Sequence, residues 1–279
     1  MPELPEVETL VRDLRGLIFG AVVARVQVSW AGAVAVPSAR RFAAGLKGRR
    51  FMAVSRHGKF LQFDLSGSRC LLVHLRMSGH LAVLPPGAEP VLYTRVTFHL
   101  ADGRRLAFSD PRKFGRLWLV DQPDLVLGKL GPDALADELT AEAFVRLIQA
   151  HRGAIKPLLL RQEVLAGLGN IYTDEALFRV GIHPLRRIDT LSEVDLRRLY
   201  GAMREVLEQA IANRGTTLPD ARFRDAWGNR GDNLGHLSVG RRKGQACPRC
   251  GAPLERTVVG GRGTYSCPAC QRQAASNCD

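Results

Sequence analysis

The chain has 279 residues, of which 46% are hydrophobic, so it is long enough to bury two cores and short for three ordinary domains. Lys and Arg number 40 against 27 Asp and Glu, which gives a formal charge of +13. This charge attracts polyanions and makes nucleic acid the first candidate partner, the alternative being a genome that favours Arg. No apolar run is as long as a membrane helix, and the acidic, proline-rich start is unlike a signal peptide. We therefore expect a cytosolic protein with no membrane partner and with reduced cysteines.

The first predicted element is an amphipathic helix over residues 6–19, with Pro5 in its first turn. Its apolar face consists of Val7, Leu10, Val11, Leu14, Leu17 and Ile18. From about 22 to 121 the pattern changes to eight short β runs separated by Gly, Pro, Asp and Ser: VVARVQVSW, RRFMAVSRH, KFLQFDL, CLLVHLRM, HLAVL, TRVTFHL, RRLAFS and RLWLV. These runs predict an antiparallel sandwich or barrel.

The remaining chain divides by composition. Residues 122–138 are rich in Asp, Gly and Pro and predict a linker between domains. Helical patterns follow, with caps predicted at Thr140 and Ser192 and ends at Gly181 and Gly215. Residues 216–236 are rich in Gly, Asn, Asp and Arg, which predicts a mobile loop. The expected domains are 1–121, 139–236 with its loop, and a small module over 237–279.

That module carries a metal-binding pattern of cysteines, C-x2-C followed after sixteen residues by C-x2-C. Each pair points two thiolates at one tetrahedral centre, and the TVV, GGRG and TYS between them predict a hairpin. Four ligands leave no open position, so we expect one structural zinc held by Cys247, Cys250, Cys267 and Cys270. The alternatives, two disulfides or an iron–sulfur cluster, do not suit a cytosolic hairpin with this spacing. Cys70 is expected in a core, and Cys278 lies in a polar tail with no partner that we can name.

The N-terminus, MPELPEVETL, offers a candidate nucleophile. Removal of Met1 would leave Pro2 with a free amine, whose pKa near 8 gives an appreciable free-base fraction at neutral pH. A secondary amine that attacks a sugar carbon forms an iminium, which acts as an electron sink. Pro2 and Pro5 could also merely start a helix, and the residue pattern alone favours that simpler reading.

Several motifs together resemble the bacterial formamidopyrimidine-DNA glycosylases. They are MPELPEVET, HGKF, LRMSGH, DPRKFG, AGLGNIYTDEALF, GIHP and the terminal zinc hairpin, in the family's order over almost the whole chain. The resemblance implies an α+β fold. Its parts are an N-terminal antiparallel β-sandwich with a leading helix, then a helical domain with a helix–two-turn–helix motif and a β-hairpin zinc finger.

The resemblance also implies a reaction and its residues. The family acts on oxidised purines, 8-oxoguanine and formamidopyrimidines, as a bifunctional glycosylase and abasic-site lyase that forms a Schiff base and performs β,δ-elimination. Pro2 is implied as the nucleophile, Glu3 as the general acid/base and Glu6 as a carboxylate that orients them. Lys59 is implied on the phosphate and base side of the lesion and Arg262 on the phosphates around it. No cofactor beyond zinc is implied.

Further residues are implied to bind the partner, damaged double-stranded DNA. Met77, Arg112 and Phe114 would fill the gap left by the flipped nucleotide, and Arg112 would favour lesions opposite cytosine. His74, Asn170, Glu175 and Arg262 would contact the DNA near the lesion. The residues alone allow other readings: a solvated lysine at 59, a core histidine at 74, an ordinary hairpin turn in DPRKFG and a helix-start glutamate at 175.

Two alternative functions stay open. One is the sister class that removes oxidised pyrimidines, against which Leu4 and the intact DPRKFG stand. The other is a DNA-binding zinc protein without activity. The sequence departs from the family pattern at Gly240, where Tyr is common, and at Arg161. It also departs in loop 216–236, which matches the family loop that closes over the flipped base. We expect a monomer in the cytoplasm of a bacterium, associated with the nucleoid through DNA.

Overall fold

The computed structural model describes residues 2–219 and 223–272, and Cys278 lies outside this part. The chain forms two compact units, residues 1–129 with 210–234, and residues 130–209 with 235–279, and each is described by itself. Helices and sheets are both present in the separate layers that an α+β fold requires, which confirms the predicted fold class. No helix in the described part of the chain is both long and apolar enough to cross a membrane.

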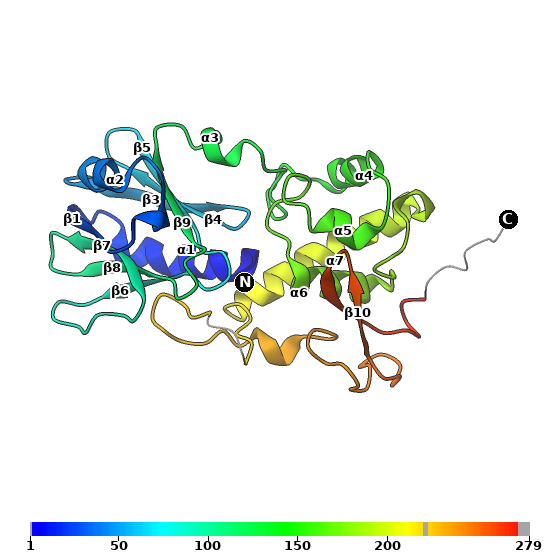
Figure 1. The fold of residues 1–279 in the computed structure, drawn as a ribbon. Coiled ribbons are helices and arrows are strands. Elements are labelled where there is room, and N and C mark those ends of the chain that lie inside the picture. The colour runs from blue at the N-terminus through cyan, green and yellow to red at the C-terminus, as the bar shows by residue number, and fades with distance from the viewer. Residues whose placement is uncertain (1, 220–222, 273–279) are drawn as a thin grey trace. The chain divides into compact units, whose positions relative to one another are not determined.

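The first unit contains two sheets (Figure 1). One has the order β1 (Val23–Val28), β7 (Thr94–Leu100), β8 (Arg105–Ser109) and β6 (His80–Leu84). The other has the order β2 (Val34–Val36), β9 (Arg116–Val120), β5 (Arg69–His74), β4 (Phe60–Leu65) and β3 (Phe51–His57). All eight predicted β runs are therefore confirmed. One edge carries a short strand that is absent from the prediction, β2, which pairs parallel to β9.

One apolar core lies between the two sheets. It receives alternate residues of both, such as Phe98 and Phe108 from one sheet and Phe63 and Val73 from the other. Helix α1 (Leu4–Ile18) covers β3 and β4 and buries the predicted apolar face, except that Leu17 is partly buried. Within residues 2–129, the unit also contains the short elements η1 (Ala31–Ala33), α2 (Ala39–Leu46) and α3 (Asp124–Leu127). The last of these lies within the predicted linker.

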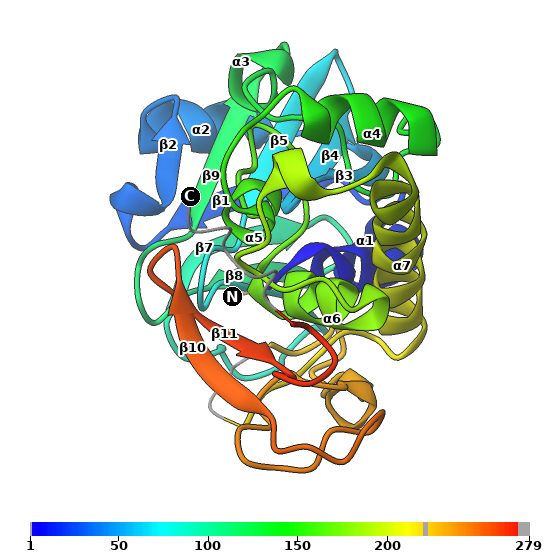
Figure 2. The same cartoon turned by 90° about the vertical axis from the view of Figure 1, so that its right-hand side faces the viewer.

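The second unit is mainly helical. Its elements are α4 (Ala141–Gln149), α5 (Ile155–Leu159), α6 (Asn170–Val180), η2 (Ile188–Thr190), most of α7 (Glu193–Ala212) and η3 (Asn233–His236), then the hairpin β10 (Glu255–Val259) and β11 (Arg262–Ser266). Thr140 caps α4 through its hydroxyl, and Gly181 ends α6 in the left-handed region, as predicted. Figure 2 shows the hairpin beside α6, with which β11 is in contact.

Residues 210–234 group with the first unit, whereas the prediction placed them in the helical domain 139–236. Phe223 and Ala226 enter the core of the sandwich, and the Thr216 backbone N–H donates to Glu6. The described parts of loop 216–236 also contain buried polar residues, which their composition does not predict. Asp225 is fully buried, and Thr216 and Thr217 are buried as well.

Candidate functional site

The start of helix α1 forms a buried polar corner. Pro2, Glu3 and Glu6 are all buried, although two of them carry carboxylates. Glu6 stands three residues after Glu3 and accepts the Glu3 backbone N–H at 2.7 Å, half of a capping box. Its other carboxylate oxygen accepts the Thr216 N–H at 2.7 Å. Glu6 therefore fixes the backbone directly after Pro2.

Lys59 and His74 lie on neighbouring strand ends in the same unit. Lys59 follows Gly58 in the tight turn between β3 and β4, and is only 5% exposed, so the reading of a solvated lysine is wrong. His74, at the end of β5, packs edge-on against Phe60 and accepts the Arg76 backbone N–H through Nδ1 at 3.0 Å. Burial lowers the pKa of His74 to about 3, with smaller contributions from Arg76 and Lys59. The ring is therefore neutral near pH 7, and Nε2 carries its proton.

This depressed pKa predicts an acid sensitivity. The folded state binds a proton at His74 more weakly than the unfolded chain does. The contribution of neutral His74 to the free energy of unfolding is therefore complete above pH 6.5 and is lost as the pH falls toward 3. Between pH 7 and pH 5 the loss from this residue is about 2 kcal/mol. We expect His74→Asn, whose amide oxygen can accept the Arg76 N–H, to remove that part of the pH dependence in urea unfolding. The exposed His236→Asn, measured in parallel, is the control for replacing a histidine by asparagine.

Met77, Arg112 and Phe114 stand on two turns of the first unit. Met77 and Phe114 are 47% and 46% exposed, unusual for apolar side chains at turn tips. Arg76 and Lys113, beside them, have positive φ values of 54° and 60°, so both turns hold strained backbone. The Arg112 guanidinium lies 4.8 Å from the centre of the Phe114 ring. The exposed Phe is thus presented together with a stacked cation, not as part of an ordinary apolar turn.

Asp110 builds and joins these two turns. It is fully buried and accepts the backbone N–H groups of Arg112 at 3.2 Å and Gly115 at 2.7 Å. It also accepts the Ser78 hydroxyl at 2.5 Å, so the turn after β5 is tied to the turn after β8. A Cβ at Gly115 would lie 2.5 Å from Phe108 Cζ, which explains the glycine. The structure therefore brings Met77, Arg112 and Phe114 onto one tied pair of turns.

The second unit brings Asn170 and Arg262 together. Asn170 is the first residue of α6, and its amide donates to the Gly263 carbonyl at 2.8 Å. Arg262 precedes Gly263 and is exposed at the start of β11, after the turn residues Gly260 and Gly261 with φ values of 56° and 74°. The hairpin thus presents Arg262 beside the N-terminus of α6, a place suited to anions.

A buried ion pair, which the sequence analysis did not predict, holds the strand β11 that begins at Arg262. Lys156 of α5 is 0% exposed and donates through Nζ to Asp174 at 2.6 Å and to the Thr264 hydroxyl at 2.7 Å. Asp174 also accepts the Tyr265 N–H at 3.0 Å. Burial raises the pKa of Asp174 to about 7, against the opposing effect of Lys156. The only sequence signal for this pair is a lysine within the apolar run AIKPLLL.

Glu175 is placed differently from the prediction. It is buried in α6, and its carboxylate accepts three consecutive backbone N–H groups, those of Ser238 at 2.8 Å, Val239 at 3.0 Å and Gly240 at 2.8 Å. Its oxygens are therefore occupied by the protein, and we expect any effect on DNA to pass through residues 238–240 instead of a direct contact. A Cβ at Gly240 would lie 3.3 Å from Glu175 Oε1, so this arrangement is tight.

The four predicted cysteines converge on one point. The ligand atoms of Cys247, Cys250, Cys267 and Cys270 all lie within 4.8 Å of one another. Two of their sulfur–sulfur distances are 3.9 Å and 3.5 Å, while a tetrahedral zinc with bonds of about 2.3 Å sets them about 3.8 Å apart. Backbone N–H groups of Arg249 and Cys270 point at the sulfurs of Cys247 and Cys267, as thiolate ligands require. The donor set fits one structural zinc.

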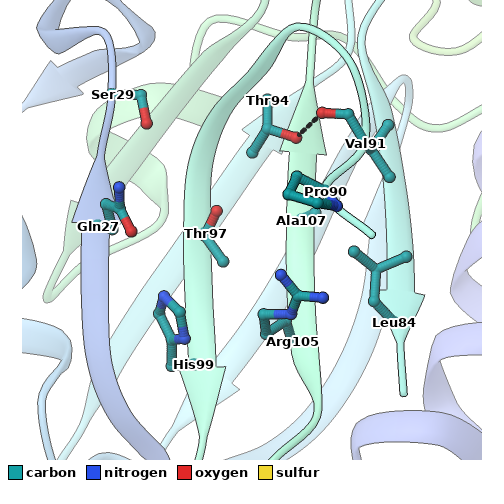
Figure 3. Close-up of a pocket in the computed structure, with 10 residues that line it drawn as sticks. All are labelled: Gln27, Ser29, Leu84, Pro90, Val91, Thr94, Thr97, His99, Arg105 and Ala107. Atoms are coloured by element: carbon teal, nitrogen blue, oxygen red, sulfur yellow. Dashed lines mark hydrogen bonds between the residues drawn. The ribbon is translucent and has the colours of Figure 1, made fainter. Parts of the chain in front are cut away.

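A cavity of about 180 Å³ lies elsewhere, on β1, β7 and β8 of the first unit (Figure 3). Thr97 and His99 line it, and they alternate along β7 with the core residues Val96 and Phe98, so the cavity opens on the face of the sheet away from the core. None of the predicted site residues lines it. The cavity is therefore separate from the polar corner at Glu3 and Glu6.

Comparisons with known proteins agree with this arrangement. Three family models match: "Formamidopyrimidine-DNA glycosylase N-terminal domain" over residues 1–117, "Formamidopyrimidine-DNA glycosylase H2TH domain" over 130–221 and "Zinc finger found in FPG and IleRS" over 244–273. The formamidopyrimidine-DNA glycosylase of a Roseiflexus species is 44% identical over 98% of this chain and 100% of its own length.

Solved structures give the same result. The MutM (Fpg) protein of Thermus thermophilus has a TM-score of 0.88 at 42% identity, covering 98% of this chain and all of its own. Lactococcus lactis Fpg, solved with DNA containing an abasic site and with DNA containing an oxidised pyrimidine, has TM-scores of 0.90 and 0.89 at 32% identity, with the same coverage. With a shared fold, all three domains and its motifs in order, this chain belongs to the formamidopyrimidine-DNA glycosylase family.

Proposed function

We propose that this protein repairs oxidised purines in duplex DNA as a bifunctional glycosylase and abasic-site lyase. The observation that carries the proposal is the buried corner in which Glu6 fixes the backbone after Pro2 with Glu3 beside it, in a member of this family. A buried carboxylate next to a terminal secondary amine is suited to proton transfer during amine catalysis. The exposed cationic turns supply the DNA contacts.

The proposed reaction begins once Met1 is removed. The damaged nucleotide leaves the base stack, and the Pro2 nitrogen attacks C1′ with its lone pair. The bond from C1′ to the base breaks, and the base departs with that electron pair and takes up the proton that the Pro2 nitrogen loses. Glu3 protonates the ring oxygen as the sugar opens, which gives an iminium at C1′. The iminium acidifies the neighbouring C–H, so successive losses of a proton eliminate the 3′ and then the 5′ phosphate.

The other predicted residues serve binding in this proposal. Lys59 and neutral His74 face the lesion strand, where the His74 Nε2 proton can be donated to a phosphate oxygen. Arg262, held beside Asn170, binds the phosphates around the flipped nucleotide. Zinc, when bound by the four cysteines, holds the finger's fold and takes no part in the chemistry. We place the protein in the bacterial cytoplasm as a monomer on nucleoid DNA.

Trapping with borohydride tests the proposal. The mature protein is mixed with a duplex that carries 8-oxoguanine opposite cytosine, and reduction should give a covalent complex whose cross-linked peptide begins at Pro2. A chain with one extra N-terminal residue, whose Pro2 nitrogen is in an amide bond, should give none. If a protein with Met1 shown to be removed yields no trapped species, the chain binds DNA without this chemistry.

A second substrate class also has support. Lactococcus lactis Fpg, 32% identical to this chain, has been solved with DNA that contains an oxidised pyrimidine. This chain could therefore accept oxidised pyrimidines besides purines. Excision rates for thymine glycol and 8-oxoguanine in otherwise identical duplexes distinguish the two, and a faster rate for thymine glycol would reverse our assignment of the main substrate.

Arg112 gives a prediction about the opposite base. Its guanidinium matches the adjacent O2 and N3 acceptors of an orphaned cytosine, whereas adenine presents a donor on that edge. We expect Arg112→Ala to reduce the preference for excision opposite cytosine over adenine by about tenfold or more, the value of one bidentate contact. Lys113→Ala removes a neighbouring charge and should weaken binding to both duplexes equally. If Arg112→Ala leaves the ratio of excision opposite cytosine to excision opposite adenine unchanged, Arg112 does not recognise the opposite base.

A further inference from the structure

Two consecutive left-handed residues follow helix α7. Arg214 has φ 58° and Gly215 has φ 80°. Glycine adopts this region freely, and a Cβ at Gly215 would lie 3.0 Å from Glu6 Cγ and Oε1, so glycine is required at 215. Arginine at 214 is strained by comparison. Such an outlier points to a role for the guanidinium itself.

The Arg214 guanidinium bridges two buried carboxylates. Its Nη2 donates to both oxygens of Asp13 in helix α1, at 3.0 Å and 2.8 Å. Its Nε and Nη2 donate to Asp225 Oδ2 at 3.1 Å and 2.5 Å. The side chains of Asp13 and Asp225 are 7% and 0% exposed, so neither charge is solvated without this fork.

Asp225 in turn organises the far side of the loop. Its Oδ1 accepts the backbone N–H groups of Trp227 at 3.0 Å and Asn229 at 2.8 Å, and its carbonyl accepts His80 Nε2 at 3.1 Å. Burial opposes the charge of Asp225, but the Arg214 hydrogen bonds and these amides outweigh it and lower its pKa. Asp13 also accepts the Ala226 N–H at 3.2 Å. The fork therefore ties residues 225–229 to helix α1.

The same fork is connected to the polar corner through the backbone. Arg214 is two residues before Thr216, whose N–H is held by Glu6 Oε1 at 2.7 Å, and Glu6 Oε2 holds the Glu3 N–H at 2.7 Å. Asp13 and Glu6 both belong to α1. The peptide between Gly215 and Thr216 is thus fixed from one side by Glu6 and from the other by the anchored Arg214.

We infer that Arg214, clamped between Asp13 and Asp225, is a positioning residue that sets the Thr216 amide on Glu6 and so the backbone of Pro2 and Glu3. This inference rests on the proposed function for its effect on excision. The Arg214 side chain does not touch the reacting atoms, and acts through Gly215, Thr216 and Glu6. The clamp also holds residues 225–229 of the loop that the family resemblance places over the flipped base.

The test compares chemistry with binding. Single-turnover excision at saturating enzyme and the Kd for a duplex with a non-cleavable abasic analogue are measured for wild type, Arg214→Gly, Arg214→Lys and Asp13→Asn. Glycine fits φ 58°, so Arg214→Gly removes the fork without straining the turn. We expect its excision rate to fall by roughly tenfold to a hundredfold while the Kd changes by less than about threefold. Lysine should restore part of the rate, and Asp13→Asn should fall in between.

Two further measurements distinguish a failure of the Arg214 inference from a failure of the proposed function. Arg104→Gly removes another arginine of the first unit, paired with Asp102, and should keep the wild-type rate and Kd. Hydrogen exchange of the Thr216 N–H should accelerate in Arg214→Gly whether or not the protein excises bases, so inactive wild type would refute the proposed function alone. A folded Arg214→Gly with wild-type rate and Thr216 protection, or a loss confined to Kd, would overturn the inference.

Discussion

Replacing Cys250 and Cys267 together by serine is expected to abolish zinc binding and with it the folded finger. The four thiolates come from the two sides of the described hairpin, and structural zinc supplies about 10–16 kcal/mol in small fingers. The small cluster around Phe178, Val239 and Leu254 includes two of the cysteines, so it should loosen as well. Arg262 would lose its fixed place, and we expect DNA affinity to fall by roughly a hundredfold, about 2.7 kcal/mol.

Metal analysis and DNA titration check this expectation. The wild type should contain one zinc per chain and the double variant none, with excision lost in parallel with binding. Cys70→Ala provides the control, because Cys70 is buried in β5 of the first unit and should keep full zinc content. A variant without zinc that retained full excision would show that the finger does not position Arg262.

The features that could be predicted from sequence are those set by neighbouring residues. Short β-prone runs separated by Gly, Pro, Asp and Ser located all eight strands, because strand residues and turn residues differ in composition over a few positions. The zinc site followed from two C-x2-C pairs, since each pair is a local turn. The hydrogen bond between Glu6 and the Glu3 backbone is equally local, since the two residues are three positions apart.

The features that were missed depend on contacts distant in sequence. Arg214 and Asp13 are separated by 201 residues, and no local pattern marks either of them. Loop 216–236 has the composition of a mobile segment, yet one buried carboxylate, Asp225, organises residues 225–229. Strand β2 and helix α2 were missed because three residues and eight residues carry too little periodicity to be distinguished from a loop.

Lys156 is another residue whose partners are distant in the sequence, and its replacement is expected to have a large effect on stability. Lys156→Met should lower the free energy of unfolding by about 3–5 kcal/mol, because it leaves the buried Asp174 carboxylate without its cation. The Thr264 hydroxyl loses its donor at the same time. Since Thr264 and Tyr265 lie directly after Arg262 and Gly263, we also expect weaker DNA binding from a residue that does not contact DNA itself.

A double-mutant cycle distinguishes this mechanism from general destabilisation. Lys156→Met with Asp174→Asn removes both charges, while the asparagine oxygen can still accept the Tyr265 N–H, so stability should recover by about 1–3 kcal/mol relative to Lys156→Met. DNA affinity should recover with it, because the turn that carries Arg262 regains an anchor. Lys243→Met removes an exposed charge in the same unit and should change stability by less than about 0.5 kcal/mol. Additive losses in the double variant would mean that the pair does not act as one unit, and that α6 holds the Arg262 turn mainly through Asn170.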